Sequence, residues 1–185
     1  MVAVFAVVRL KLVQLARNTR HLRRTPAAAG AGTGAAINVG GTSAHVVAIN
    51  NTAAGVISAG TASGNAILIA NGTGAVTVTN SGTSTILGKV NLGNNAGSAI
   101  NLTGGSITGL VTMGANAQAL NLNGGQVIGD IAGSGTVKAL VDYTAQGNIT
   151  ANSVVVTDGK VLTTGTNTVT SAVTVGTGAA GATLT

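Results

Sequence analysis

Short apolar runs alternate with small polar residues along the chain from about residue 35 to residue 185. The runs are mostly three to five residues long, are rich in Val and Ile, and are separated by pairs such as Asn-Gly, Gly-Gly and Asp-Gly. β-Branched side chains favour strands, and Gly and Asn accept the backbone angles of tight turns. The pattern therefore predicts an all-β domain of short strands. Representative runs are Val46–Ile49, Ile67–Ile69, Ala75–Thr79, Ser153–Thr157 and Ala172–Val175.

An imperfect repeat within this region indicates how the strands are arranged. Residues 99–109 (Ala-Ile-Asn-Leu-Thr-Gly-Gly-Ser-Ile-Thr-Gly) return, at an offset of 20, as residues 119–129 (Ala-Leu-Asn-Leu-Asn-Gly-Gly-Gln-Val-Ile-Gly), with six of the eleven positions identical. Residues 86–90 match the segments that begin at Ile107 and Val127, at offsets of 21 and 20. Repetition at a short, nearly fixed period is typical of a parallel β-helix (β-solenoid), in which each repeat forms one coil of a stack.

The solenoid interpretation predicts which residues lie above each other. A coil of about 20 residues holds three short strands with their turns, so residues one period apart are stacked. Asn101 is then expected to form an amide ladder with Asn121, and Lys138 to form an exposed ion pair with Asp158. The residues predicted to mark the repeat and its corners are Asn101, Gly104, Gly105, Gly109, Asn121, Gly124, Gly125 and Gly129.

The repeat also bears on the dimensions of the domain. About 150 residues correspond to seven or eight coils and, at ~4.8 Å per coil, to a rod ~35 Å long. Residues 65–72 resemble residues 98–105 and are expected to occupy the equivalent part of an earlier coil. A sandwich of antiparallel hairpins is the structural alternative, because Asn-Gly and Asp-Gly pairs also favour hairpin turns.

Charge and composition together divide the chain into three segments. Six of the nine Lys and Arg residues lie in the first 24 positions, whereas the remaining three Lys are balanced by three Asp. We predict a basic amphipathic helical segment over residues 1–26, an Ala/Gly linker over residues 27–34, and the solenoid domain over residues 35–185. The basic segment is typical of a membrane-surface helix or signal anchor, with membrane contact through residues 1–24. It also fits an appendage that is unrelated to the solenoid.

Composition excludes several functional classes. The chain has no Cys, which excludes a disulfide framework, a thiolate zinc site and a cysteine nucleophile. Aromatic residues make up 1% of the chain, and the repeat region has no basic stripe, so we expect no nucleic-acid partner.

Few side chains are suited to acid–base or metal chemistry. The chain has three Asp and no Glu, and the three carboxylates, Asp130, Asp142 and Asp158, follow one another at offsets of 12 and 16. Stacking at a 20-residue period does not bring these residues together, whereas glycoside hydrolysis needs two carboxyl groups that face one bond. His21 lies in the basic segment and His45 in a predicted strand. We therefore expect no catalytic, cofactor-binding or metal site.

The Gly-, Asn-, Thr- and Ala-rich composition, with the Leu-Asn-Gly-Gly-x-Val element at residues 122–127, resembles the passenger domains of bacterial autotransporters (type V secretion) and related filamentous adhesins. The resemblance covers about residues 35–185. It implies a right-handed parallel β-helix at the bacterial cell surface or outside the cell, with a structural or adhesive role and contact with a host surface protein or glycan. A secretion signal and a translocator barrel are not recognised, so we expect a passenger fragment.

The sequence is also compatible with two other functions and with one mode of association. Thr77-Val78-Thr79 and Thr168-Val169-Thr170 have the form of ice-binding pairs on a flat β-solenoid face, although such pairs do not recur in every coil. A polysaccharide-active β-helix enzyme is the second alternative. The open edges of the terminal coils are also expected to permit self-association.

Deletion of residues 1–24 is predicted to leave the solenoid intact. The segment is rich in Arg, and the repeat region, with three Asp, offers it no acidic surface to contact. The shortened chain should keep its β-rich circular dichroism spectrum and nearly the same melting temperature. A large loss of stability would instead mean that the segment caps the first coil.

Overall fold

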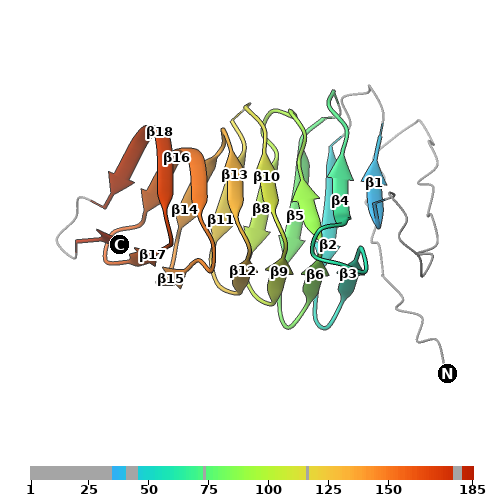
Figure 1. Ribbon diagram of the computed structural model, residues 1–185, viewed down its shortest axis with the longest axis horizontal. Helices are drawn as coiled ribbons and strands as arrows, with labels where there is room; N and C mark the ends of the chain where they lie inside the picture. Colours follow the sequence, from blue (N-terminus) through green and yellow to red (C-terminus); the bar gives the residue numbers. More distant parts are fainter. Residues whose placement is uncertain (1–34, 41–45, 73, 116, 177–180) are drawn as a thin grey trace.

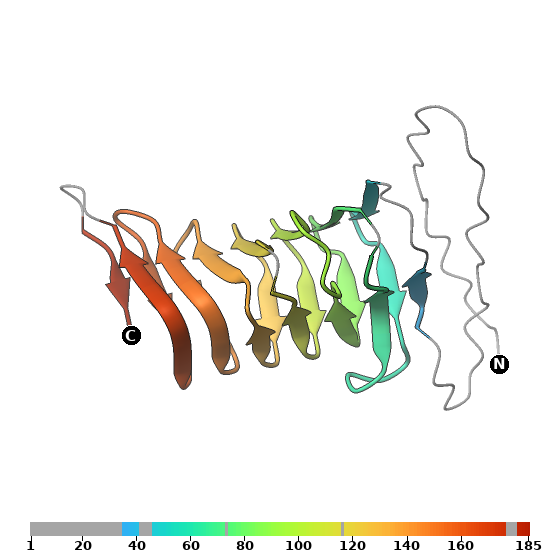
Figure 2. The same ribbon diagram turned by 90° about the horizontal axis from the view of Figure 1, so that it is seen from above.

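The computed structural model describes residues 35–40, 46–72, 74–115, 117–176 and 181–185. These residues form an all-β solenoid of about six turns that contains no helix, and its strands pair in parallel. Figures 1 and 2 show the strands stacked side by side along the long axis. The predicted parallel β-solenoid is confirmed, and the hairpin sandwich is wrong. The predicted basic helix of residues 1–26, the linker of residues 27–34, His21 and His45 lie outside the described residues.

The strands are arranged on three faces of the solenoid (Figure 1). The first face contains β1 (Ile37–Val39), β4 (Asn65–Ile69), β7 (Lys89–Asn91), β10 (Val111–Met113) and β13 (Ile131–Gly133). The second face contains β2 (Val47–Asn51), β5 (Val76–Asn80), β8 (Ala99–Leu102), β11 (Ala119–Leu122) and β14 (Thr136–Ala139). The third face contains β3 (Val56–Ser58), β6 (Thr85–Leu87), β9 (Ser106–Thr108) and β12 (Gln126–Ile128), followed by β15 (Tyr143–Thr144), β17 (Val161–Thr163) and β19 (Thr183–Leu184).

Two long strands join the first face to the second near the C-terminal end. β16 (Ile149–Val156) pairs with β13 at its beginning and with β14 further along, and β18 (Asn167–Val175) pairs along β16. An irregularity in the register between Ala151 and Ser153 marks the point where β16 turns from one face to the other. Both faces therefore belong to one continuous hydrogen-bonded sheet.

The register confirms the stacking predicted from the central repeat. Ile86 lies opposite Ile107, which lies opposite Val127, at the predicted offsets of 21 and 20. Asn101 lies opposite Asn121 in β8 and β11. Three consecutive coils thus obey the period that the sequence shows.

On both sides of the central coils, the offset between stacked residues departs from the 20 or 21 residues of the repeat. Val47 lies opposite Val76, an offset of 29, so the first coil is much longer than predicted and the solenoid has about six turns instead of seven or eight. Lys138 lies opposite Val155, an offset of 17, so the predicted stacking of Lys138 on Asp158 is wrong. Strand pairing constrains the strands alone, and the loops between them vary in length.

The match of residues 65–72 to residues 98–105 is also wrong. It would place Ile67 level with Ile100, but Ile67 pairs with Val90 on the first face, whereas Ile100 pairs with Val78 on the second. Apolar–polar alternation is shared by all three faces, so local similarity cannot identify the face to which a strand belongs.

Columns of aliphatic side chains fill the interior. Inward-pointing residues of successive coils superimpose, and members of these columns are 0–1% exposed. On the first face, one column contains Ile67, Val90, Val111, Ile131 and Ile149. On the second, another contains Val78, Ile100, Leu120, Val137 and Val154. Each buried methylene contributes about 0.8 kcal/mol, so a narrow coil of Val, Ile and Leu forms a core without large aromatic residues.

Buried amides replace aliphatic residues at one corner of the first coils. Nδ2 of Asn51 donates to Oδ1 of Asn80 at 2.8 Å, and the hydroxyl of Ser84 donates to the same oxygen at 2.8 Å. Nδ2 of Asn80 donates to the carbonyl oxygens of Ser84 and Gly104 at 3.2 and 3.0 Å. In the next coil Leu102 takes the stacked position. The amides therefore satisfy backbone carbonyls where the chain turns.

The predicted corner glycines lie where successive turns stack closely. Gly105 has φ +66, and a Cβ there would clash with the carbonyl oxygen of Ser84. Gly104 has no such φ, but a Cβ would lie 2.6 Å from the carbonyl oxygen of Gly82. The remaining repeat glycines with positive φ are Gly109, Gly124, Gly125 and Gly129.

Tyr143 bridges an interruption in the third face. β12 and β15 are not paired as strands, and the backbone N–H of Val127 donates instead to the Tyr143 hydroxyl at 2.7 Å. The residue is 6% exposed, and burial raises the pKa of Tyr143 from 10.0 to about 12, although the hydrogen bond from Val127 opposes this shift. One phenolic oxygen thus replaces a backbone carbonyl at the point where the coil is shortened.

Gly105→Ala is predicted to destabilise the solenoid more than Gly60→Ala. Both positions have positive φ, but a Cβ at Gly60 meets nothing within 4 Å. The control, Gly60→Ala, should lower the free energy of unfolding by about 1–2 kcal/mol, because the left-handed backbone alone disfavours a Cβ. Gly105→Ala should lower it further, because the Ser84 carbonyl must also move. Urea denaturation of both variants measures the difference. Equal losses would mean that the stacked corner has room for a methyl group.

Tyr143→Phe is predicted to lower the free energy of unfolding by about 1–3 kcal/mol, because the buried N–H of Val127 loses its acceptor. The folded-state pKa of Tyr143 is raised, so its stabilising contribution is present below pH 10 and is lost as the pH rises through about 12. Denaturation from pH 8 to pH 12 should therefore show a steeper alkaline loss for the parent than for the variant.

Phenolate absorbance provides an independent check of this pKa. The chain has one Tyr and no Trp, so the signal reports Tyr143 alone. A transition near pH 10 in the folded protein would contradict the buried hydrogen bond.

Candidate functional site

Outward side chains of the second face form a column of hydrogen-bonding groups. The register places Asn50, Thr79, Asn101, Asn121 and Lys138 opposite one another in successive coils. Nδ2 of Asn121 donates to Oδ1 of Asn101 at 2.7 Å, so the predicted amide pair is confirmed. All of these residues except Lys138 are uncharged, which gives this face a mostly neutral polar surface.

The threonine pairs do not form an array on this face. Thr77 and Thr79 point outward from β5, but Ala99 and Asn101 take the corresponding positions in β8. The second pair lies on β18, where Thr168 is opposite Thr150. The described strands therefore lack the coil-by-coil Thr-x-Thr repetition on which the ice-binding interpretation depends.

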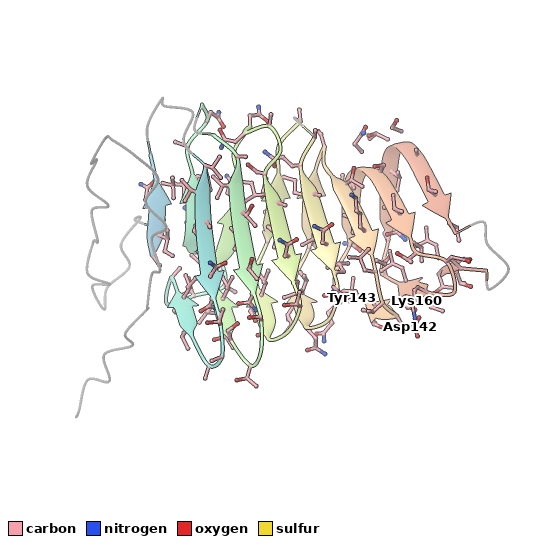
Figure 3. The ribbon with its side chains drawn as sticks, turned by 180° about the vertical axis from the view of Figure 1, so that it is seen from behind. Asp142, Tyr143 and Lys160 are labelled. Carbon is pink, nitrogen blue, oxygen red and sulfur yellow. The ribbon has the colours of Figure 1, made fainter. Side chains whose placement is uncertain are left out.

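Two of the three aspartates have structural hydrogen bonds at the corners. Oδ1 of Asp130 accepts the backbone N–H of Asn148 at 2.9 Å, and Oδ1 of Asp142 accepts that of Val161 at 3.0 Å. Asp158 is exposed in the turn after β16. Figure 3 shows Asp142 at the same end of the solenoid as Tyr143. Within the described residues, no group of three or more His, Cys, Asp or Glu side chains is placed to hold a metal ion.

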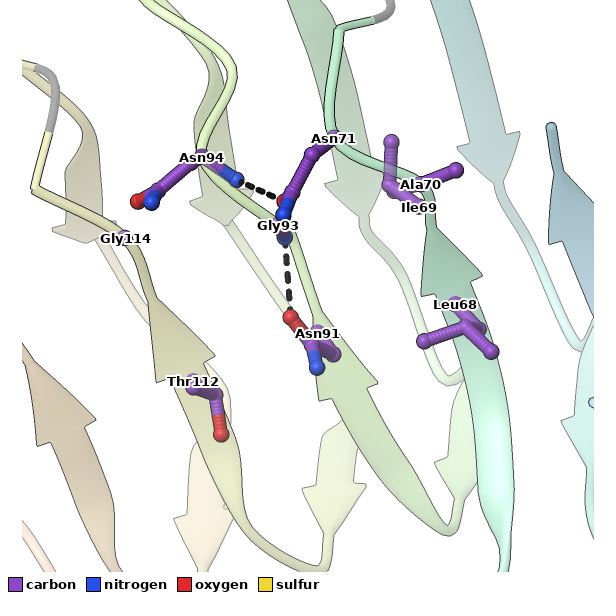
Figure 4. A pocket seen from close by; sticks show the side chains of 9 residues that line it. All are labelled: Leu68, Ile69, Ala70, Asn71, Asn91, Gly93, Asn94, Thr112 and Gly114. Atoms are coloured by element: carbon purple, nitrogen blue, oxygen red, sulfur yellow. Dashed lines mark hydrogen bonds between the residues drawn. The ribbon is translucent and has the colours of Figure 1, made fainter. Parts of the chain in front are cut away.

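A shallow groove crosses the first face and the corner that follows it (Figure 4). It has a volume of about 390 Å³ and extends over β4, β7 and β10. Its lining residues are uncharged: Leu68, Ile69, Ala70, Asn71, Asn91, Gly93, Asn94, Thr112 and Gly114. The register places Asn91 opposite both Leu68 and Thr112, so the floor of the groove is one outward column of the first face.

Backbone hydrogen bonds hold the groove asparagines in position. Oδ1 of Asn91 accepts the N–H of Gly93 at 2.8 Å, and Oδ1 of Asn71 accepts the N–H of Asn94 at 2.8 Å (Figure 4). Oδ1 of Asn94 in turn accepts the N–H of Ala115 at 2.8 Å. Because a backbone N–H can only donate, each amide must turn its oxygen toward it, and this fixes the direction of the Nδ2 group.

Comparison with profiles of protein families, with curated proteins and with solved structures finds no match to the chain. The described residues contain no helix with the length and hydropathy needed to cross a membrane.

Sequence reasoning identified the Asn101–Asn121 pair but missed the groove. The offset between Asn71 and Asn94 is 23, which differs from the offsets of 20 and 21 that mark the repeat. Asn91 and Thr112 do lie at an offset of 21, but they stand just beyond the matched segments and differ in residue type. The available signal was the recurrence of Asn shortly after the strands of the first face, and the register was needed to recognise it.

Proposed function

We propose that this chain is a structural or adhesive β-solenoid that acts at the bacterial cell surface or outside the cell. Its faces would contact a host surface protein or glycan, or other copies of the chain through the solenoid edges. The observation that carries the proposal is the neutral polar column of Asn50, Thr79, Asn101 and Asn121, which presents a hydrogen-bonding group once per coil.

The repetition of weak contacts supports this function. Each exposed hydrogen bond contributes little by itself, but contacts that repeat at ~4.8 Å along a rigid rod are made together. An uncharged face also avoids non-specific attraction to charged surfaces. The corner hydrogen bonds of Asp130 and Asp142 support a structural use of these carboxylates over the enzymatic alternative.

The resemblance to autotransporter passengers supports two further parts of the proposal, which are a location at the cell surface or outside the cell and a right-handed winding of the solenoid. Parallel crossovers between strands are right-handed in most known proteins, because this hand agrees with the twist of the strands. On this proposal the chain is part of a passenger-like rod. The basic segment of residues 1–24 would then be a separate element that contacts a membrane surface.

The test measures binding of the purified full chain to immobilised extracellular matrix and to host-cell layers over a range of salt concentrations. We expect saturable binding that changes little with salt, because the contacts are mainly neutral. A variant with Thr79→Val, Asn101→Ala and Asn121→Ala should bind more weakly. Lys138→Gln is the matched control, since it changes the same column without removing a neutral amide or hydroxyl, and it should bind like the parent.

Two outcomes would contradict the proposal. The first is a folded chain that binds no surface and does not self-associate. The second is cleavage of a polysaccharide that is lost in Asp130→Asn, Asp142→Asn or Asp158→Asn, which would favour the enzyme instead.

A further inference from the structure

We propose that the groove of Figure 4 is a subsite for an uncharged oligosaccharide that lies across β4, β7 and β10. This inference rests on the proposed adhesive function and names the chemical class that the groove would bind. The assignment comes from the orientation of the amides, the mixed character of the lining and the place of the groove in the sheet.

The groove contains hydrogen-bond donors whose direction is set by the backbone. The oxygens of Asn71 and Asn91 accept N–H groups of Asn94 and Gly93, so their Nδ2 groups are turned away from those bonds. Within the described part of the chain, neither Nδ2 group has a protein acceptor. An amide that is already held in place loses little conformational freedom on binding, which favours contact with a ligand hydroxyl.

The lining combines these donors with apolar surface. Leu68 lies on one side of Asn91, and Thr112, with one hydroxyl and one methyl group, lies on the other. A sugar ring has hydroxyl groups around its edge and C–H groups on its faces, so both kinds of surface find a counterpart. The lining residues are uncharged, and a carboxylate or sulfate would meet no cation among them. The chemistry therefore favours a neutral sugar.

The geometry favours an extended polymer along the solenoid axis. Leu68, Asn91 and Thr112 follow one another at the spacing of parallel strands, ~4.8 Å, which is comparable to the length of one sugar ring. A volume of about 390 Å³ in an open groove accommodates a short stretch of such a chain. An open site of this size gives weak binding and fast exchange, which is suited to a polymer that makes further contacts elsewhere.

A peptide fits this position less well. Extended peptides bind sheets by adding a strand to an open edge, but β4, β7 and β10 each have a strand on both sides, so their backbone groups are already paired. Side-chain amides and the Thr112 hydroxyl remain the means of recognition, and these suit hydroxyl-rich ligands.

The experiment is a titration of the ¹⁵N-labelled full chain, followed by NMR, with three classes of probe. The probes are neutral oligomers of glucose and of N-acetylglucosamine, an acidic oligogalacturonate, and an extended neutral peptide. We expect the neutral sugars to shift the backbone amides of Gly93, Asn94 and Gly114 with millimolar affinity. Asn91→Ala and Thr112→Val should each weaken binding about threefold or more, as expected for the loss of one hydrogen bond.

Thr108→Val is the matched control for Thr112→Val. Thr108 is also a half-buried outward Thr, but it lies in β9 on the third face, so this change should leave oligosaccharide affinity unaltered. Circular dichroism melts establish that each variant is folded. If Asn91→Ala fails to fold, Thr112→Val provides the test, because it preserves the β-branched shape of a strand residue.

The inference is overturned if neutral sugars shift no groove amide at saturating concentration, if the acidic sugar or the peptide is preferred there, or if the folded groove variants bind like the parent. It is distinguishable from the proposed function. Matrix binding by a chain whose groove amides respond to no neutral sugar overturns the groove assignment and leaves the adhesive role in place. Sugar binding in the groove of a chain that binds no surface supports the subsite and overturns the adhesive role.

Discussion

Parallel hydrogen bonding between successive coils is the constraint on which the rest of this structure depends. Apart from the gap between β12 and β15, strands pair in register with the equivalent strands of the neighbouring coils, so residues on the same face superimpose at ~4.8 Å. Inward positions then become continuous aliphatic columns, such as Ile67, Val90 and Val111. Outward positions become columns of polar groups by the same geometry. The core and the surface are therefore two consequences of one backbone ladder.

The ladder tolerates coils of different length because side chains replace backbone groups where pairing is interrupted. Tyr143 supplies an acceptor to Val127 at the point where β12 and β15 do not pair. Asn80 supplies donors to the carbonyl oxygens of Ser84 and Gly104 at a corner, and Asp130 accepts an N–H at another. Buried backbone N–H and C=O groups at the corners need such partners, because a buried group without a hydrogen bond lowers the free energy of unfolding by about 1–3 kcal/mol.

Backbone hydrogen bonding also fixes the orientation of polar side chains on the surface. The groove amides of Asn71 and Asn91 are oriented by backbone N–H groups of the turns, and those turns are positioned by the strands beneath them. A surface built in this way presents neutral groups in fixed directions and at a regular spacing. Adhesion through many weak contacts uses such regularity, whereas acid–base catalysis needs charged groups gathered at one point.

The sequence by itself determined the fold class and the register of the central coils. Apolar–polar alternation predicted the strands, and the similarity of residues 99–109 to residues 119–129 placed Asn101 on Asn121, because side chains repeat directly when coils are equal in length. The tertiary structure decided the coils whose lengths differ. It set Lys138 opposite Val155, made Tyr143 part of the ladder and brought Leu68, Asn91 and Thr112 into one groove. Loop length carries no periodic signal, and only strand pairing shows which residues of unequal coils lie together.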